Sequence, residues 1–205
     1  MPNYCTNNLT VSGDEKEIKR FHEAIIQGDD RESYNQFSIL DNLLPTPIEL
    51  RETPKGSFGE SEKQKQMEEM QKANKAKYGH ADWYDWNCAN YGSKWSDFDG
   101  VFGTITPTEL NMTFMSAWSP IGEGIRRVSK QFPTLDFVLS YEEGGMAFCG
   151  GYAFRNSEII ADIEGEYPSM NGVDDEDYDA MYEQVTETLE AIEVQCKEAL
   201  SIVSV

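Results

Sequence analysis

The chain has 205 residues and a formal net charge of −20, from 37 acidic and 17 basic side chains. This charge opposes direct binding to nucleic acid and to anionic membranes, because their phosphate groups would be repelled. A hydrophobic fraction of 39% with 12% aromatic residues excludes a disordered chain and is sufficient for a sizeable core. We expect one domain over residues 1–205, with an insertion at about residues 45–80 and an acidic C-terminal helix at about residues 175–203.

The residue types that bind metals are sparse and scattered along the chain. They are Cys5, Cys88, Cys149, Cys196, His22 and His80, and the cysteines form no CxxC pair. We therefore predict no metal and no cofactor, and we expect buried free thiols in a reducing compartment. The N-terminus lacks a basic and apolar signal sequence, and no apolar run reaches membrane-spanning length. A cytoplasmic protein without a membrane segment is expected.

Periodicity predicts alternating strands and helices in the first part of the chain. Apolar residues alternate over residues 5–11, which indicates a strand with one buried side. A capping box from Ser12 to Glu15 begins a helix with the stripe Ile18, Phe21 and Ile25, which ends at residues 28–30. Residues 34–44 are expected to be extended or irregular, and residues 51–59 form a polar loop. Residues 60–78 predict an exposed helix with an apolar edge of Met67, Met70 and Ala73.

The middle of the chain predicts a short helix, a hairpin and a second core helix. The helix covers residues 83–90, and strands follow at about residues 100–106 and 109–118. Trp118 ends the apolar face of the second strand, so we predict that it is buried and that Trp118→Ala costs roughly 3–5 kcal/mol of stability. Ser119 is expected to cap the next helix, with Pro120 at its first position.

Three further strands and a long helix complete the prediction. Residues 135–141 alternate as a strand, and residues 146–154 place bulky side chains on one face and small ones on the other, which predicts close approach of a helix or backbone. A last strand is expected at about residues 157–163, and a long helix begins at about Asp175. The order predicts an α+β fold with a ferredoxin-like antiparallel sheet (βαββαβ core), a helical insertion, and extra C-terminal strands and helix.

Three ordered motifs carry a resemblance to a known family. They are Asn90-Tyr91-Gly92-Ser93-Lys94-Trp95-Ser96, Ala117-Trp118-Ser119-Pro120-Ile121, and Tyr141-Glu142-Glu143-Gly144 followed by Phe148-Cys149-Gly150. Together with the opening MPNYCTNNLTVSG, the chain resembles the YubB-like proteins with a ferredoxin-like domain, which bacteriophages, plasmids and related mobile elements encode. The resemblance extends to about residue 154 and skips the insertion. It implies this fold and a protein that acts in the cytoplasm of a host cell.

The chain departs from the family pattern at four motif positions. Tyr91, Ser93, Ser96 and Ile121 stand where the family has Trp, Thr, Asp and Pro. The missing Asp argues against a catalytic centre in this motif. P-loop, G-x-S-x-G and H-E-x-x-H signatures are also absent from the sequence, so we favour a protein without enzymatic activity.

Two surfaces are candidate sites. The first is a ligand pocket that uses Lys94 as its charged group; the alternative is that the tryptophans pack in the core and Lys94 lies along them. Its predicted residues are Asn90, Tyr91, Lys94, Trp95, Trp118 and Glu142. The second is an acidic surface on the C-terminal helix, for which the alternative is a merely solubilising face. Its predicted residues are Asp175, Asp177, Asp179, Glu183, Glu187 and Glu190.

The acidic surface lies in the most strongly charged part of the chain. From Glu158 to Val205 the sequence has 14 acidic residues against one lysine, Lys197. Carboxylates four residues apart on a helix lie ~6 Å apart, which is sparser than the ~3.4 Å between phosphates of one DNA strand. One helix therefore cannot imitate DNA by itself.

The same helix carries an apolar seam that bears on oligomeric state. The seam is Tyr178, Tyr182, Val185, Leu189, Ile192, Cys196, Ala199 and Val203. Such a narrow a/d stripe predicts packing against another helix, because a helix on its own sheet usually has a wider stripe. The flanking acids oppose self-pairing, so we expect intramolecular packing and a monomer.

The leading functional hypothesis is a non-enzymatic, acidic interaction module of a phage or other mobile element. It would bind and inhibit a host defence or nucleic-acid-processing protein through a basic surface of that partner, without direct contact to nucleic acid. The alternative is a small-molecule or nucleotide-binding protein, with or without enzymatic activity, that has a pocket around Tyr91, Lys94, Trp95 and Trp118. An apolar cavity that contains Lys94 would favour the alternative, and a flat acidic face would favour the leading hypothesis.

Overall fold

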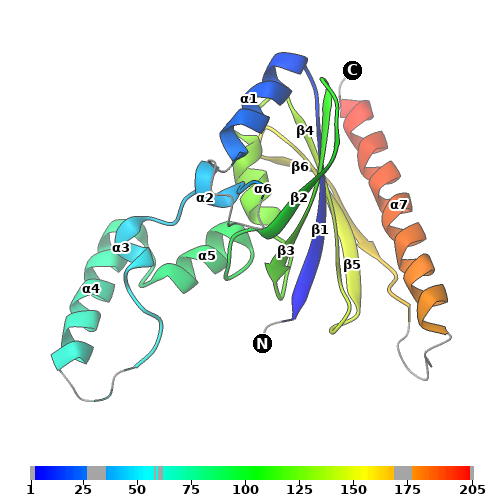
Figure 1. The fold of residues 1–205 in the computed structure, drawn as a ribbon. Coiled ribbons are helices and arrows are strands. Elements are labelled where there is room, and N and C mark those ends of the chain that lie inside the picture. Colours follow the sequence, from blue (N-terminus) through cyan, green and yellow to red (C-terminus); the bar gives the residue numbers. More distant parts are fainter. Residues whose placement is uncertain (1–2, 27–35, 58, 60–61, 169–176, 204–205) are drawn as a thin grey trace.

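A six-stranded antiparallel sheet organises the protein (Figure 1). The computed structural model describes residues 3–26, 36–57, 59, 62–168 and 177–203. The strand order is β2-β3-β1-β4-β5-β6, and its first four strands have the order of a ferredoxin-like βαββαβ unit. The predicted α+β class and sheet are thus confirmed. The strands are β1 (Tyr4–Ser12), β2 (Phe98–Ile105), β3 (Glu109–Ala117), β4 (Asp136–Glu143), β5 (Phe148–Arg155) and β6 (Glu158–Gly165).

The helices cover the sheet from two sides. In Figure 1, α1 and α6 lie on one side of the sheet and α7 lies on the other, while α2 to α5 extend away from α1 and α6. Helices α3 and α4 lie within the predicted insertion, whereas α2 and α5 lie just outside its predicted bounds. The helices are α1 (Glu15–Ile25), α2 (Leu40–Leu43), α3 (Ile48–Arg51), α4 (Glu62–Tyr78), α5 (Trp83–Tyr91), α6 (Gly122–Ser129) and α7 (Asp177–Val203).

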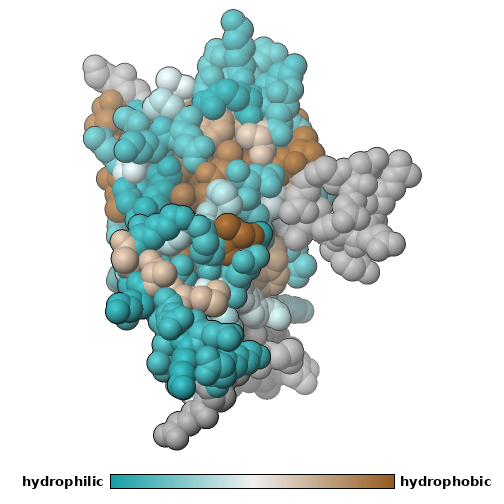
Figure 2. Space-filling view, turned by 90° about the vertical axis from the view of Figure 1, so that its left-hand side faces the viewer, coloured by the Kyte–Doolittle hydropathy of each residue, from teal (hydrophilic) through white to brown (hydrophobic). Residues whose placement is uncertain are grey.

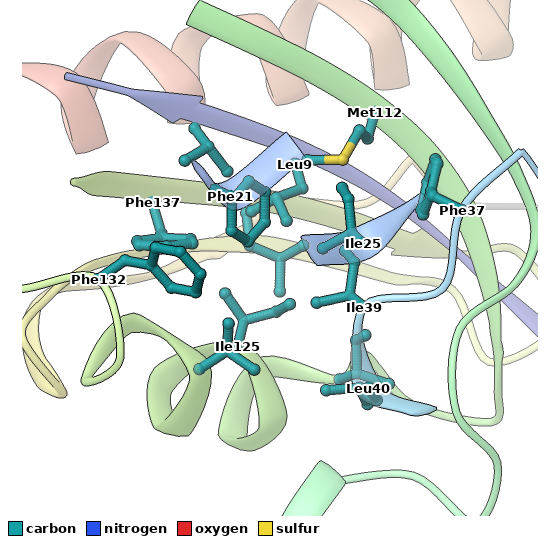
Figure 3. Close-up of a cluster of buried hydrophobic side chains, with 14 of the residues drawn as sticks. Leu9, Phe21, Ile25, Phe37, Ile39, Leu40, Met112, Ile125, Phe132 and Phe137 are labelled. Atoms are coloured by element: carbon teal, nitrogen blue, oxygen red, sulfur yellow. The ribbon is translucent and has the colours of Figure 1, made fainter. Parts of the chain in front are cut away.

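The main hydrophobic core lies between the sheet and the helices α1 and α6 (Figure 3). The predicted stripe of α1 is confirmed, because Ile18, Phe21 and Ile25 are all buried. The ring of Phe21 stands edge-on to Phe132 at 5.1 Å and to Phe137 at 5.6 Å between centroids. Edge-to-face contacts of this kind add stability beyond that of the buried area.

A second, smaller core lies between α7 and the strands β4 to β6. The predicted face of small residues on β5 is where this helix packs, because a Cβ added at Gly151 would collide with Ile192 of α7. Intramolecular packing of α7 is therefore confirmed. The expectation of a helix as its partner is wrong, since Met181 and Leu200 join the buried stripe and widen it, whereas Tyr182 of the predicted seam is 59% exposed.

The ends of the two core helices differ from the predictions. Asp14, not Ser12, caps α1, and its side chain accepts a hydrogen bond from the Lys16 amide. The helix ends at Ile25, and the predicted stop at residues 28–30 lies outside the described residues. Ser119 does not cap α6, which begins two residues later than predicted, because its hydroxyl donates to the Gly92 carbonyl at 2.6 Å instead.

The chain before β2 contains two short helices that the sequence analysis does not predict. Helix α2 lies where an extended or irregular segment is expected, and α3 ends at Arg51, the first residue of the predicted loop. Along α4, Met67 is buried as predicted, but Asn74 takes the inner position expected for Ala73, because its amide donates to the Thr53 hydroxyl and the Ala81 carbonyl. The rest of α4 is largely exposed, and Figure 2 shows a mainly hydrophilic surface where this helix projects at the bottom of the view.

Candidate functional site

The first two sequence motifs pack against each other at one end of the sheet. Gly92 ends α5 with φ 88°, a left-handed conformation that glycine adopts without strain. The hydroxyl of the next residue, Ser93, donates to the Ala117 carbonyl at 2.8 Å and accepts from the Ala117 amide at 3.2 Å. With the bond from Ser119 to Gly92, these contacts join the two motifs directly.

The third motif lies at the same end, beside the start of β1. Buried Glu143 accepts hydrogen bonds from the amides of Gly145 at 3.0 Å and Met146 at 2.7 Å, which closes the turn between β4 and β5. A Cβ at Gly145 would collide with the side chain of Asn3, and the Asn3 carbonyl accepts from the Trp118 amide at 3.0 Å. Polar groups of all three motifs thus hold this end of the sheet together.

Trp118 is not buried, contrary to the prediction. Its side chain is 47% exposed, and its φ of 72° is in the left-handed region, which bulky residues rarely adopt. The regular alternation of β3 ends at Ala117, so the next side chain leaves the face that Leu110, Met112 and Phe114 share. The prediction failed because it extended the strand by one residue through a change of backbone direction.

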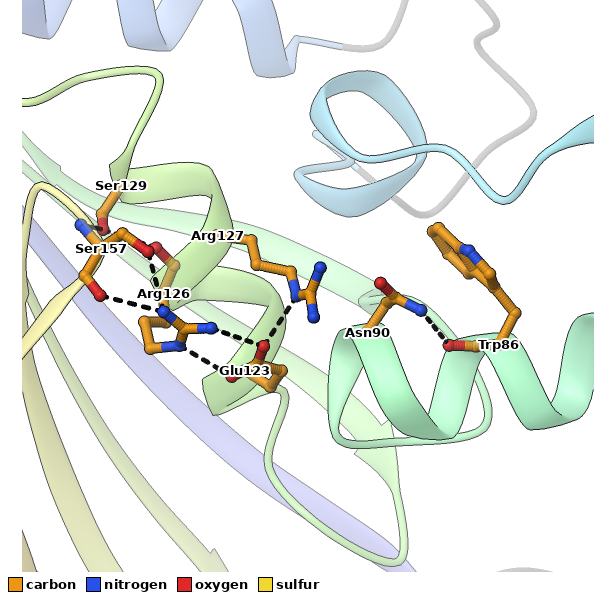
Figure 4. Close-up of polar contacts among 7 residues, drawn as sticks. All are labelled: Trp86, Asn90, Glu123, Arg126, Arg127, Ser129 and Ser157. Carbon is orange, nitrogen blue, oxygen red and sulfur yellow. Dashed lines mark hydrogen bonds and ion pairs between the residues drawn. The ribbon is translucent and has the colours of Figure 1, made fainter. Parts of the chain in front are cut away.

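Asn90 and Tyr91 are internal residues rather than ligand-facing ones. The Tyr91 ring is fully buried, and its hydroxyl donates to the Leu44 carbonyl at 2.9 Å; burial raises its pKa to about 12. The Asn90 amide donates to the Trp86 carbonyl at 2.8 Å within α5 (Figure 4). Both side chains therefore serve packing and internal hydrogen bonds rather than a ligand pocket.

Lys94, Trp95 and Trp118 do lie together at the surface. The Lys94 ammonium is 4.1 Å from the centroid of the Trp95 ring and 6.0 Å from that of Trp118. Distances of this size allow cation–π attraction. Glu142 is separate from this group; it pairs with Thr6 across the sheet and accepts a hydrogen bond from the Tyr167 hydroxyl at 3.4 Å.

A cavity of about 730 Å³ opens beside this group, between the start of β1, the start of β2 and the helices α2, α3 and α5. We call it the aromatic cavity. Of the predicted pocket residues it contains Trp95, and not Lys94. Its aromatic lining is Tyr4, Trp83, Trp95 and Phe98, and its polar lining is Asp41, Thr46, Arg51, Asn87, Ser96 and Asp99.

Three of the four rings of the aromatic cavity form a continuous wall. Phe98 stands edge-on to Tyr4 at 5.5 Å and to Trp95 at 6.1 Å between centroids. Of the cavity lining, sequence reasoning placed Trp95 in a pocket and missed the others, among them Tyr4 and Asp41. They come from segments that are distant in the chain, and no spacing rule connects them.

Asp97 fixes one wall of the cavity from behind. Its buried carboxylate accepts from the amides of Ile39 at 2.8 Å and Leu40 at 2.9 Å, and so it caps α2, the helix that carries Asp41. Burial raises the pKa of Asp97 to about 6, although the two amide hydrogen bonds oppose the shift. The residue after the predicted motif therefore has a structural role that the motif did not indicate.

The predicted acidic surface is exposed on α7. Asp179, Glu183, Glu187 and Glu190 all face solvent, and within the described residues none of them forms an ion pair. Asp175 lies outside the described residues, and so does the side chain of Asp177. We call the four exposed residues the acidic row.

A third polar cluster, at α6, is already satisfied internally (Figure 4). Glu123 accepts from Arg126 at 2.8 Å and Arg127 at 2.7 Å, which lowers the pKa of its carboxyl group. Arg126 also donates to the Ser157 carbonyl at 3.0 Å and thereby ties α6 to the turn between β5 and β6. These arginines are engaged in holding the fold.

The cysteines are free thiols, as predicted, but they are not all buried. Cys5, Cys149 and Cys196 are buried, whereas Cys88 on α5 is exposed. Burial raises the pKa of Cys5 to about 12 and that of Cys196 to about 11, which keeps both thiols protonated. Among the described residues, no group of three or more His, Cys, Asp or Glu side chains is placed to hold a metal ion, and no helix could cross a membrane.

Comparison with known proteins bears on the fold and on the motif region. Residues 89–184 match the family model described as the ferredoxin-like domain in Api92-like protein. This part of the chain resembles the Api92-like proteins. A crystal structure of the protein api92 from Yersinia pseudotuberculosis is similar to this chain at 12% sequence identity and a TM-score of 0.43, over 82% of this chain and 99% of that one. No curated protein matches the chain. The Api92-like match runs from α5 into α7 and contains all three motifs.

Proposed function

We propose that this protein is a non-enzymatic interaction module that binds a basic surface of another protein through the acidic row of α7. The observation that carries the proposal is that Asp179, Glu183, Glu187 and Glu190 are exposed together without internal cationic partners among the described residues. Carboxylates kept free in this way are available to lysine and arginine side chains of a partner.

The packing of α7 on the sheet suits this helix to the role. Val185, Ile192 and Cys196 hold its inner face on the sheet, so a row on the outer face is presented by a rigid element. Charges ~6 Å apart along a helix match separate basic side chains better than they match the spacing of a nucleic-acid backbone.

The partner in this proposal is a defence or nucleic-acid-processing protein of a host cell, and binding inhibits it. Proteins that act on nucleic acid have basic surfaces, which a carboxylate row complements. The motif resemblance to YubB-like proteins supports an origin in a phage or another mobile element that acts in the host cytoplasm. A net charge of −20 also opposes direct binding to nucleic acid.

Charge reversal tests the proposal. The partner is purified from host cells with the tagged protein, and its binding is then measured with both pure proteins at several salt concentrations. Glu183→Lys, Glu187→Lys and Glu190→Lys together should abolish binding without a change in thermal midpoint, and wild-type association should slow steeply with salt.

A matched control separates the position of the charges from their number. Glu62→Lys, Glu68→Lys and Glu69→Lys on the exposed α4 make the same change in net charge and should leave binding within about threefold. Equal losses in both triple variants, or binding that survives the α7 reversal at high salt, would reject the acidic row as the contact surface.

A second candidate function is small-molecule binding in the aromatic cavity. The observation that favours it is the size and lining of the cavity, about 730 Å³ with four aromatic rings and several convergent polar groups. Ligand sites in proteins have this size and composition. It uses Trp95, while Lys94 and Trp118 lie on its outside, so the two candidate functions occupy different parts of the molecule.

A further inference from the structure

We propose that the aromatic cavity binds an organic cation, a small molecule that carries an ammonium or quaternary ammonium group. This inference rests on the second candidate function, and it names the chemical class of the ligand. It is independent of the acidic row, which lies on α7 and contributes no side chain to the cavity.

The first argument is the aromatic wall. Phe98 lies between Tyr4 and Trp95, and the side chains of those two neighbours are 49% and 38% exposed. The fold thus leaves apolar surface of these two rings exposed at the cavity. The faces of such rings carry partial negative charge, which attracts a cation and offers nothing comparable to an anion.

The second argument is the charge of the cavity. Asp41 and Asp99 line it, and within the described part of the chain neither carboxylate forms an ion pair; Asp41 accepts only a hydrogen bond from Ser96. The single cationic side chain in the lining is Arg51, so the formal charge of the lining is negative. The field of the whole chain has the same sign.

The third argument is an ammonium group that the protein itself places on this ring system. Lys94 holds its Nζ 4.1 Å from the centroid of the Trp95 ring, outside the cavity. The same indole that lines the cavity thus attracts an intramolecular cation. A nucleotide fits less well, because its phosphates would meet two carboxylates with one arginine to compensate them.

Binding of choline chloride to the full chain tests the inference, with isothermal titration calorimetry as the readout. The neutral control is 3,3-dimethylbutan-1-ol, which has the shape of choline without the charge, and the anionic control is AMP. Choline should bind at least about tenfold more tightly than the neutral isostere, because the charge carries the cation–π and carboxylate interactions. Its affinity should also weaken with added sodium chloride.

Two variants locate the binding. Trp95→Ala should weaken choline binding by about tenfold. Asp41→Asn with Asp99→Asn should weaken it by about fivefold or more, and Asn suits the φ of 52° at residue 99. Glu183→Gln with Glu187→Gln on α7 makes the same change in net charge and should leave choline binding unchanged. A thermal midpoint within about 3 °C of wild type confirms that each variant is folded.

The outcomes separate the two levels of the proposal. The inference that the ligand is a cation is wrong if choline and its neutral isostere bind equally. It is also wrong if the α7 control loses as much choline binding as the cavity variant. If AMP binds and choline does not, and Trp95→Ala abolishes AMP binding, the ligand is not a cation. The proposal that the cavity binds a small molecule is then retained. Absence of binding by all three probes at millimolar concentration rejects both.

Discussion

Glycine should be better tolerated than alanine at position 118, although the residue lies next to a strand. Trp118 is 47% exposed, so about half of its ~200 Å² is buried, and losing this contact costs ~2.5 kcal/mol at ~25 cal/mol per Å². Its φ of 72° costs any residue with a Cβ about 1 kcal/mol, and glycine avoids this cost. We therefore expect Trp118→Ala to lose ~2.5 kcal/mol and Trp118→Gly only ~1.5 kcal/mol.

Urea unfolding monitored by far-UV circular dichroism measures both values, provided that the m-values agree. Trp95 supplies the matched control, because it is also a half-exposed tryptophan but is not among the residues with positive φ. There glycine should be the worse substitution by ~0.5–1 kcal/mol. If Trp118→Gly is less stable than Trp118→Ala, Trp118 does not have a left-handed backbone. A loss of 3–5 kcal/mol would instead restore the buried tryptophan predicted from the sequence.

Three further predictions concern buried groups. Asp97 has a pKa of about 6 when folded and 3.8 as a free side chain, so the folded state binds more protons and this residue's contribution to stability falls as pH rises from about 4 to 6. Asp97→Asn should gain ~1–3 kcal/mol relative to wild type between pH 4 and 7 in urea unfolding, and a constant difference would contradict the shift. Iodoacetamide should label Cys88 in the native protein and the other three cysteines only after denaturation, which peptide mass spectrometry checks; early labelling of Cys196 would mean that α7 leaves the sheet. Gly151→Ala should lower the unfolding free energy by ~1–3 kcal/mol, because the new methyl group collides with Ile192, whereas Gly103→Ala, whose Cβ meets only ordinary contacts, should cost less than about 1 kcal/mol.

The sequence determined the sheet and the faces that its helices bury. Alternation along β1 and β3 has a period of two, and the stripes of α1 and α6 have a period near 3.6, so each of these elements shows its inner face locally. The order of these elements then leaves few arrangements, of which the ferredoxin-like sheet is one. The small residues of β5 likewise predicted a close neighbour, and a Cβ at Gly151 would indeed collide with Ile192 of α7.

Only the tertiary structure decided which side chains from different elements meet at the surface. Tyr4, Asp41, Trp83 and Trp95 meet in the aromatic cavity although they belong to separate segments, and periodicity carries no information on such meetings. The capping of α2 by Asp97 is also non-local, because its hydrogen bonds join residues 57 and 58 positions apart. Local patterns record whether a side chain faces the core, whereas a site is made by contacts between elements, and those are fixed only when the chain packs.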